Sequence, residues 1–336
     1  MTDRSYDVLA VGRSAIDLYA REVGVPFTEV KSFAAYVGGC PTNVCVGARR
    51  LGLRAAMLNA VGDDLVGDFV QSFLEREGVE TRFGVRKPGR RTSAFMLAIE
   101  PPDRFSIVPY RDNCADLELT VEDVRAAPVA DARALVLTGT GLSRQPSRDA
   151  TLFAAQTARA HQTRVVLDLD FRPELWPDAR DYGAALGALL PHVDIVLGTT
   201  EEIKTALPGL APGGSGGGKI SAAGALVESE VGVAAMLSAG PRAVVEKRGG
   251  ESTRVHFGDG RRVEVATFRV EVMNVLGAGD AFAAGFLYGH LRSWGWQRAV
   301  RLGNACGAIV VTRHGCANFM PTEREALWFI ETHGGF

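Results

Sequence analysis

Short apolar runs separated by longer helix-like stretches are the feature that most limits the fold of this chain. The runs occupy residues 7–11, 55–61, 134–137, 164–169, 195–197 and 243–245. Strands that are buried on both faces of a parallel sheet have this continuous apolar character, and helices supply the crossovers between them. We therefore predict an α/β fold with a mostly parallel central sheet that is covered by helices on both faces.

Two stretches break this alternation. Residues 30–36 and 92–110 have strand-like composition without an intervening helix-like segment. They are expected to form a small antiparallel flap outside the main sheet. Such a flap can act as the lid that a water-sensitive group transfer requires.

Size and charge exclude two classes of partner. The chain has 336 residues, of which 46% are hydrophobic, and its formal net charge is −2. This length fits one large α/β domain or two smaller ones. Because the chain carries no broad basic field, neither nucleic acid nor an anionic membrane surface is expected as a partner.

Cysteine usage and the N-terminus indicate a cytoplasmic protein. The five cysteines are odd in number and lack C-x-x-C spacing, and the six histidines make no metal-binding pair with them. A strand-like run starts almost directly after Met1, so no signal peptide is expected. No apolar run approaches the roughly 20 residues of a membrane span.

A glycine turn, an acid and an apolar helix-like run follow one another between Asn274 and Phe286. Gly277 and Gly279 permit backbone conformations that bring successive N–H groups close to a ligand, and the helix points its positive end at the same place. Asp280 stands at the start of that helix. The segment can hold an anion beside a proton acceptor, although such an acid can also be a simple helix cap.

A second polar cluster is expected near the N-terminus. Asp17 lies just beyond the first strand, at the edge where ligands bind in open α/β sheets. Gly38, Gly39 and Asn43 precede a helix, and an acid and an amide beside bare glycine backbone can bind the hydroxyls of a polyol. The alternative is a glycine turn with Asn43 as a cap.

The glycine-rich stretch at 209–219 imitates a phosphate-binding P-loop. Ile220 stands where a Ser or Thr should bind magnesium, and a helix-like segment precedes the stretch in place of a strand. We therefore interpret it as a solvated surface loop.

Together these segments resemble the PfkB, or ribokinase-like, family of carbohydrate kinases. The resemblance rests on residues 38–43, Leu51-Gly52, residues 61–67 and residues 274–286, whose order and separation match over nearly the whole chain. It implies a ribokinase-like three-layer sandwich. It also implies a single kinase domain over residues 1–336, with a β lid formed by insertions at about 13–37 and 92–116.

The resemblance implies roles for individual residues as well. Asp280 corresponds to the catalytic base, and Gly277, Ala278 and Gly279 correspond to the anion hole. The sugar-binding positions are Asp17, Gly38, Gly39 and Asn43, and the ATP-side positions are Asp170, Thr199, Glu202, Lys247, Gly249 and Asn304.

The resemblance implies ATP and Mg²⁺ as cofactors and, as in some relatives, a monovalent cation such as K⁺. It also implies a homodimer joined through lid contacts. Glu202 would organise hydrated Mg²⁺. Four residues depart from the family pattern. They are Cys45, Leu276, Ser252, which stands where a second Gly is common, and Thr199, which replaces the Asn of an Asn-x-x-Glu motif.

Two arginines lie in informative motifs. Arg111 follows Tyr110 in the expected lid, and Arg172 follows a central strand at the ligand-bearing edge. An arginine fork matches a carboxylate, and neutral sugars need no cation, so these residues suggest an acid sugar bound by Tyr110, Arg111 and Arg172. The alternative is that both arginines are solvated surface residues.

The same segments resemble the sugar-acid branch of the family, and within it the 5-dehydro-2-deoxygluconokinases of inositol catabolism. That resemblance implies ATP-dependent phosphorylation of the 6-hydroxyl of 5-dehydro-2-deoxy-D-gluconate. It extends to residues 194–199, so Thr199 fits this branch. The alternatives are a 2-keto-3-deoxygluconate kinase, another PfkB sugar kinase, or a non-catalytic sugar-acid sensor.

Overall fold

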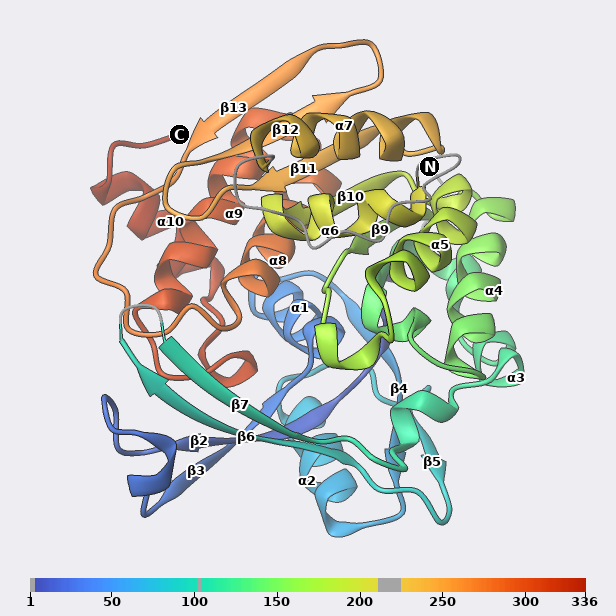
Figure 1. Cartoon of the computed structure of the whole chain (residues 1–336), viewed down its shortest axis with the longest axis vertical. Helices are drawn as coiled ribbons and strands as arrows, with labels where there is room; N and C mark the ends of the chain where they lie inside the picture. Colours follow the sequence, from blue (N-terminus) through green and yellow to red (C-terminus); the bar gives the residue numbers. More distant parts are fainter. Residues whose placement is uncertain (1–3, 102–103, 211–224) are drawn as a thin grey trace.

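The computed structural model describes residues 4–101, 104–210 and 225–336. Within these ranges the strands form one large sheet and one small sheet, and helices cover both faces of the large one (Figure 1). None of the helices in the described ranges is long and apolar enough to cross a membrane.

The large sheet contains nine strands among the described residues, in the order β13-β12-β11-β10-β9-β8-β1-β4-β5. The strands from β11 to β5 in this order are parallel, and β12 and β13 add an antiparallel hairpin at one edge. Their bounds are β1 (Tyr6–Gly12), β4 (Ala55–Gly62), β5 (Val85–Lys87), β8 (Ala132–Thr138), β9 (Arg164–Asp168), β10 (Ile195–Thr199), β11 (Ala243–Lys247), β12 (Ser252–Phe257) and β13 (Arg262–Ala266).

The apolar runs of the sequence form the central strands because both faces of the sheet are buried. In β1, Val8 and Ala10 pack into one hydrophobic cluster, whereas Leu9 and Val11 pack into the other. Successive side chains of a strand point to opposite faces, so burial on both sides requires an unbroken apolar run.

Two groups of helices complete the three layers. One face carries α1 (Cys40–Arg50), α2 (Leu65–Arg76), α8 (Ala278–Leu291), α9 (Trp296–Val311) and α10 (Glu323–Thr332). The other face carries α3 (Val121–Arg125), α4 (Ser147–Ala160), α5 (Ala179–Leu189), α6 (Thr200–Leu210) and α7 (Ala225–Ser238). Short 3₁₀ helices are η1 (Phe27–Glu29), η2 (Ala115–Glu118), η3 (Val129–Asp131), η4 (Gly139–Leu142), η5 (Pro173–Leu175), η6 (Leu190–His192) and η8 (Ala317–Phe319).

The small sheet has the order β3-β2-β6-β7 and lies beside the main body (Figure 1). The expected flap is mixed and not purely antiparallel, because its β2–β6 pair is parallel, whereas β2–β3 and β6–β7 are antiparallel. The segments expected to form the lid, 13–37 and 92–116, contain nearly all of these strands, and the lid function and the single-domain division stay predictions. The bounds are β2 (Ala15–Ala20), β3 (Phe33–Gly38), β6 (Ser93–Glu100) and β7 (Arg104–Tyr110).

Helix α6 extends two residues into the stretch that was expected to be a loop. Gly209 and Leu210, which were expected in the loop at 209–219, belong to α6, and the rest of that stretch lies outside the described residues. A Cβ at Gly183 would lie 2.7 Å from the Cα of Gly209. Helix α6 can therefore continue because two glycines allow its backbone to pack closely against α5.

Candidate active site

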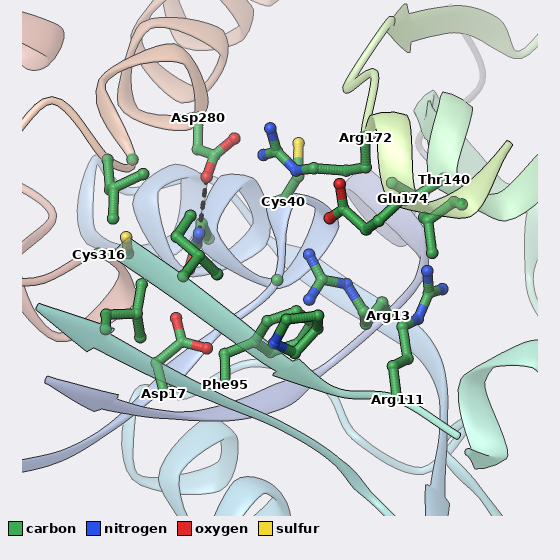
Figure 2. A pocket seen from close by; sticks show the side chains of 18 of the residues that line it. Arg13, Asp17, Cys40, Phe95, Arg111, Thr140, Arg172, Glu174, Asp280 and Cys316 are labelled. Atoms are coloured by element: carbon green, nitrogen blue, oxygen red, sulfur yellow. Dashed lines mark hydrogen bonds between the residues drawn. The ribbon is translucent and has the colours of Figure 1, made fainter. Parts of the chain in front are cut away.

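A cavity lies between the small sheet and the carboxyl edge of the large sheet (Figure 2). Alternate residues of β2, β6 and β7 face it, because the period of a strand places every second side chain on one face. It is lined by Arg13, Asp17, Tyr19, Gly39, Cys40, Asn43, Phe95, Leu97, Ile107, Pro109, Arg111, Thr140, Arg172, Glu174, Leu175, Leu276, Gly277, Asp280 and Cys316.

The glycine turn at 277–280 forms the N-terminus of α8, as expected. Gly277 caps the helix with φ +82°, and a Cβ there would lie 2.9 Å from Sγ of Cys316, so both backbone and space require glycine. Asp280 lies in the first turn and faces the cavity. Ala278 N donates to the carbonyl oxygen of Val275 at 3.3 Å. The N–H groups of Gly279 and Asp280 have no partner within the helix, so they remain available to an anion.

Asn43 of α1 holds the Asp280 carboxylate. Its Nδ2 donates a 2.6 Å hydrogen bond to Oδ2 of Asp280 (Figure 2). Burial and the Asp170 carboxylate raise the pKa of Asp280 above its ordinary value, and hydrogen bonds from Cys40 and Asn43 oppose that rise. Asp280 is thus oriented by a neighbour and has the increased basicity that proton acceptance needs.

Asp17 projects from β2 into the same cavity and is 7% exposed. Burial raises its pKa to about 7, and the Arg13 guanidinium opposes this shift. Gly38 makes room for the carboxylate, because a Cβ at Gly38 would lie 1.8 Å from Oδ2 of Asp17. Gly39, with φ +107°, caps α1, and its Cβ would lie 2.4 Å from the carbonyl oxygen of Arg13.

Both predicted arginines reach the cavity, and each is paired with a carboxylate of its own segment. Nε of Arg111 donates to Oδ2 of Asp116 at 3.0 Å, and its side chain is 7% exposed. Nη2 of Arg172 lies 2.8 Å from Oδ1 of Asp170, and its side chain is 45% exposed. Both arginines line the same cavity, as expected. Tyr110 does not line it, and its side chain is 58% exposed.

Sequence reasoning did not assign Arg13. This residue joins β1 to β2, and its guanidinium lies over the ring of Phe95 at 4.4 Å. Its position between the first strand and Asp17 was a usable signal, but one arginine among 32 carried no further mark.

A second polar group lies at the ends of β9, β10 and β11. Nζ of Lys247 donates to Oδ2 of Asp168 at 3.0 Å. A Cβ at Gly279 would lie 3.0 Å from the same nitrogen, so the ammonium sits beside the glycine turn. Burial lowers the pKa of Lys247, but the carboxylates of Asp168 and Glu202 outweigh it and raise that pKa overall. A cation beside free helical N–H groups suits a phosphate.

Thr199 and Glu202 form a reciprocal cap at the start of α6. Oε2 of Glu202 accepts hydrogen bonds from N of Thr199 at 2.8 Å and from its Oγ1 at 3.1 Å, and Oγ1 in turn accepts from N of Glu202 at 3.2 Å. Phe171 N donates to the other carboxylate oxygen at 3.1 Å. The capping box explains why Thr can replace Asn here.

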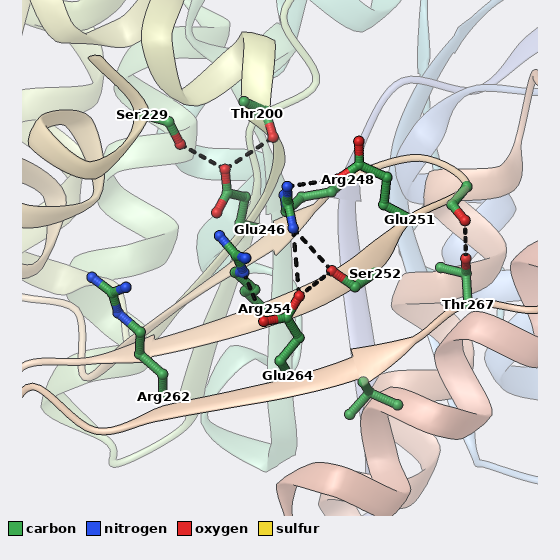
Figure 3. A network of polar contacts seen from close by, with 12 residues as sticks. Thr200, Ser229, Glu246, Arg248, Glu251, Ser252, Arg254, Arg262, Glu264 and Thr267 are labelled. Atoms are coloured by element: carbon green, nitrogen blue, oxygen red, sulfur yellow. Dashed lines mark hydrogen bonds and ion pairs between the residues drawn. The ribbon is translucent and has the colours of Figure 1, made fainter. Parts of the chain in front are cut away.

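A polar network connects β11 to the helices and the strand next to it (Figure 3). The buried Glu246 accepts hydrogen bonds from Thr200 Oγ1 at 2.9 Å and from Ser229 Oγ at 2.6 Å, and it lies 3.0 Å from His256 Nε2. Although burial raises the pKa of Glu246, these partners hold it at about 2. The network ties α6 and α7 to β11 and so fixes the strand that presents Lys247.

Two predicted ATP-side residues have other partners in the structure, and a third lies in an open turn. Asp170 accepts from Thr140 Oγ1 at 3.1 Å in addition to pairing with Arg172. Asn304 accepts from Thr253 Oγ1 at 2.7 Å and donates to the Ala266 carbonyl at 3.2 Å. Gly249 has φ +59° in the turn between β11 and β12, and a Cβ there would meet nothing within 4 Å. The ATP contacts of these residues stay predictions.

Leu276, which departs from the family pattern, packs against the small sheet. It contacts a buried cluster that includes Tyr19, Leu97, Ile99 and Cys316. Its N–H donates to Oδ1 of Asn274 at 3.0 Å. A large apolar residue at this position therefore joins the glycine turn to the small sheet.

Comparisons with known proteins agree with this architecture. A family model described as pfkB family carbohydrate kinase matches residues 5–323. The 5-dehydro-2-deoxygluconokinase of Shouchella clausii is 33% identical over 329 residues, which make up 98% of this chain and 96% of that protein.

Two solved structures have the same fold. The fructokinase of Xylella fastidiosa with bound ATP gives a TM-score of 0.83 at 26% identity and covers 97% of this chain and 98% of that one. A putative ribokinase II of E. coli in complex with ATP and Mg²⁺ gives 0.81 at 23% identity, covering 98% and 100%. The predicted ribokinase-like fold with a smaller second sheet is thereby confirmed.

Proposed function

Since this chain belongs to the pfkB family of carbohydrate kinases, we propose that it transfers the γ-phosphoryl group of ATP to the 6-hydroxyl of 5-dehydro-2-deoxy-D-gluconate in myo-inositol degradation. The observation that carries this proposal is the Asn43–Asp280 pair at the start of α8, which faces a cavity lined by arginines. The relatives named 5-dehydro-2-deoxygluconokinase support the choice of acceptor.

Asp280 is the proposed general base. As the 6-oxygen attacks the γ-phosphorus, its proton passes to the Asp280 carboxylate, the bond from the γ-phosphorus to the bridging oxygen breaks, and ADP leaves. Asn43 holds the carboxylate in place during this step. The raised pKa of Asp280 favours its acceptance of the proton.

The turn at Gly277, Ala278 and Gly279 would hold the migrating phosphoryl group. First-turn N–H groups and the positive end of α8 oppose its charge, and Lys247 adds a cation beside Gly279. These groups are fixed before the reaction, so their orientation costs little as charge develops.

Glu202 is the residue that would hold Mg²⁺, through water. The described residues contain no group of three or more His, Cys, Asp or Glu side chains able to form a metal cage. Mg²⁺ retains several waters and binds through one or two carboxylates together with substrate phosphates, so the Glu202 carboxylate beside a phosphate site fits that ion. When bound with ATP, Mg²⁺ neutralises charge on the phosphates.

The sugar acid would lie with its carboxylate toward the arginines and its 6-hydroxyl toward Asp280. Arg111 and Arg172 retain N–H donors beyond those used by Asp116 and Asp170. Asp17 and Asn43 would bind the hydroxyls between the two ends. This placement presents the acceptor oxygen in line with ATP.

The remaining expectations belong to the same proposal. We propose a cytoplasmic homodimer that also responds to a monovalent cation near residues 277–280. Measuring the mass in solution and comparing turnover in KCl with turnover in a salt of a bulky organic cation would test the dimer and the cation separately.

Substrate comparison tests the proposed function. ATP consumption should be fastest with 5-dehydro-2-deoxy-D-gluconate, slower with 2-keto-3-deoxygluconate and slowest with ribose or fructose. Preference for 2-keto-3-deoxygluconate would favour that kinase, and preference for a neutral sugar would refute the role of both arginines. Binding of an acid with no ATP consumption would favour a sensor.

A further inference from the structure

Arg13 differs from the other two cavity arginines in having no ion pair within the described residues. Its Nε is buried without a hydrogen-bond partner, and its guanidinium points into the cavity (Figure 2). An under-satisfied buried cation costs free energy unless a ligand or water completes its bonds.

The backbone of Arg13 is held at its carbonyl oxygen. Its carbonyl oxygen accepts a 3.0 Å hydrogen bond from Oγ1 of Thr42, and Gly39 approaches that same oxygen closely. The guanidinium also rests on the Phe95 ring of the small sheet. The side chain is therefore held between α1 and the small sheet, so little conformational freedom is lost when it binds an anion.

The acidic groups around Arg13 leave it free to bind a ligand. Asp17 of β2, Glu174 of η5 and Asp280 of α8 line the same cavity, and none of them forms an ion pair with Arg13 in the described chain. Asp116 and Asp170 already pair with Arg111 and Arg172. Among the three cavity arginines, Arg13 is the one whose positive charge is in direct contact with no carboxylate of residues 4–101, 104–210 and 225–336.

We propose that Arg13 is a specificity-determining residue that binds the substrate carboxylate directly. The inference rests on the proposed sugar-acid kinase function and deepens it. Arg13 supplies the unpaired charge, whereas Arg111 and Arg172, whose charges Asp116 and Asp170 already match, contribute further N–H donors.

The test compares an acid with its neutral analogue in wild-type protein and in Arg13→Gln. The two substrates are 5-dehydro-2-deoxy-D-gluconate and its carboxamide, which differ in charge at one end. Loss of a charge-assisted bond should lower kcat/KM for the acid by about 30- to 100-fold in Arg13→Gln and leave the carboxamide within about three-fold. Arg13→Lys should retain part of the preference, since it keeps the charge and loses the fork.

Arg125→Gln is the matched control. Arg125 also lies over a phenylalanine, Phe153 at 4.6 Å, but it does not line the cavity. It should keep the acid preference of the wild type. If Arg13→Gln fails to fold, the acid preference of Arg13→Lys decides, and an undiminished preference in that variant overturns the proposal.

Other outcomes separate the two proposals. If the wild type uses neither substrate, the proposed function fails. If the wild type prefers the acid and Arg13→Gln keeps that preference, only the role of Arg13 fails. An equal loss on both substrates, with a shifted pH profile, would show that Arg13 acts through Asp17 and would overturn direct carboxylate binding.

Discussion

The amide of Asn43 donates a 2.6 Å hydrogen bond to the carboxylate of Asp280 and so joins the N-terminal turns of α1 and α8 at the wall of the cavity. The two residues are 237 positions apart in the chain. Neither residue alone distinguishes a catalytic site from a pair of helix caps, but their contact gives a candidate base with a fixed orientation.

Asn43→Ala should move the acid limb of the kcat/KM profile to higher pH. The hydrogen bond from Asn43 lowers the pKa of Asp280, so its loss lets that pKa rise further. A smaller fraction of the base is then ionised at neutral pH, and activity there should fall about ten-fold. Cys45→Ala, on the same helix but bonded to Ala56, is the control; an unmoved acid limb would contradict this role.

Asp17→Asn should make stability less dependent on pH. In the folded protein the pKa of Asp17 is raised to about 7, so the native state binds more protons than the unfolded state between the unfolded pKa of 3.8 and 7. Stability therefore falls as pH rises through this window, by on the order of 2–4 kcal/mol at completion.

Denaturant unfolding of the wild type and Asp17→Asn at several pH values checks this expectation. The variant should gain stability relative to the wild type as pH increases, although it loses sugar binding. If the unfolding free energies of the wild type and the variant change equally with pH, the pKa of Asp17 is not raised by its burial.

Glu202→Gln should weaken the binding of MgATP. The KM for MgATP should rise by about 10- to 100-fold, because a carboxylate that orients metal-bound water is lost. Glu201→Gln is the matched control, since Glu201 is its neighbour, its side chain is 82% exposed and it pairs with Lys204. Equal effects of the two substitutions in a Mg²⁺ titration would contradict the assignment.

Gly38→Ala should lower kcat/KM for the sugar acid to the same extent as Asp17→Ala. The added Cβ would occupy the space of the Asp17 carboxylate, 1.8 Å from Oδ2, and would force it out of the cavity. The double variant should then be no worse than either single variant in kcat/KM, because the two changes remove one interaction. Gly250→Ala, where a Cβ meets nothing within 4 Å, should be neutral; additive losses would exclude the shared cause.

The central strands were predictable because burial on both faces leaves a continuous apolar signal. The β12–β13 hairpin was not predicted. Its strands carry polar residues such as Arg254 and Glu264 between their apolar ones, so they lack the continuous apolar run of the central strands. The Asp259-Gly260 pair in its turn was a signal for a hairpin. The position of Asp280 in the first turn of α8 was predictable from the local glycine pattern. The pairs Arg111–Asp116 and Arg172–Asp170, and the absence of an ion pair at Arg13 in the part of the chain that the structure describes, depend on side-chain packing that sequence spacing does not reveal.

Turnover of Asp280→Asn with 5-dehydro-2-deoxy-D-gluconate and saturating MgATP, measured together with calorimetric binding of the acid, tests the role of Asp280 most directly. We predict that kcat falls by about 1,000-fold while the Kd of the acid stays within about three-fold of the wild type, because the amide keeps the shape and loses the proton acceptor. Near-normal turnover by Asp280→Asn would contradict its role as the general base.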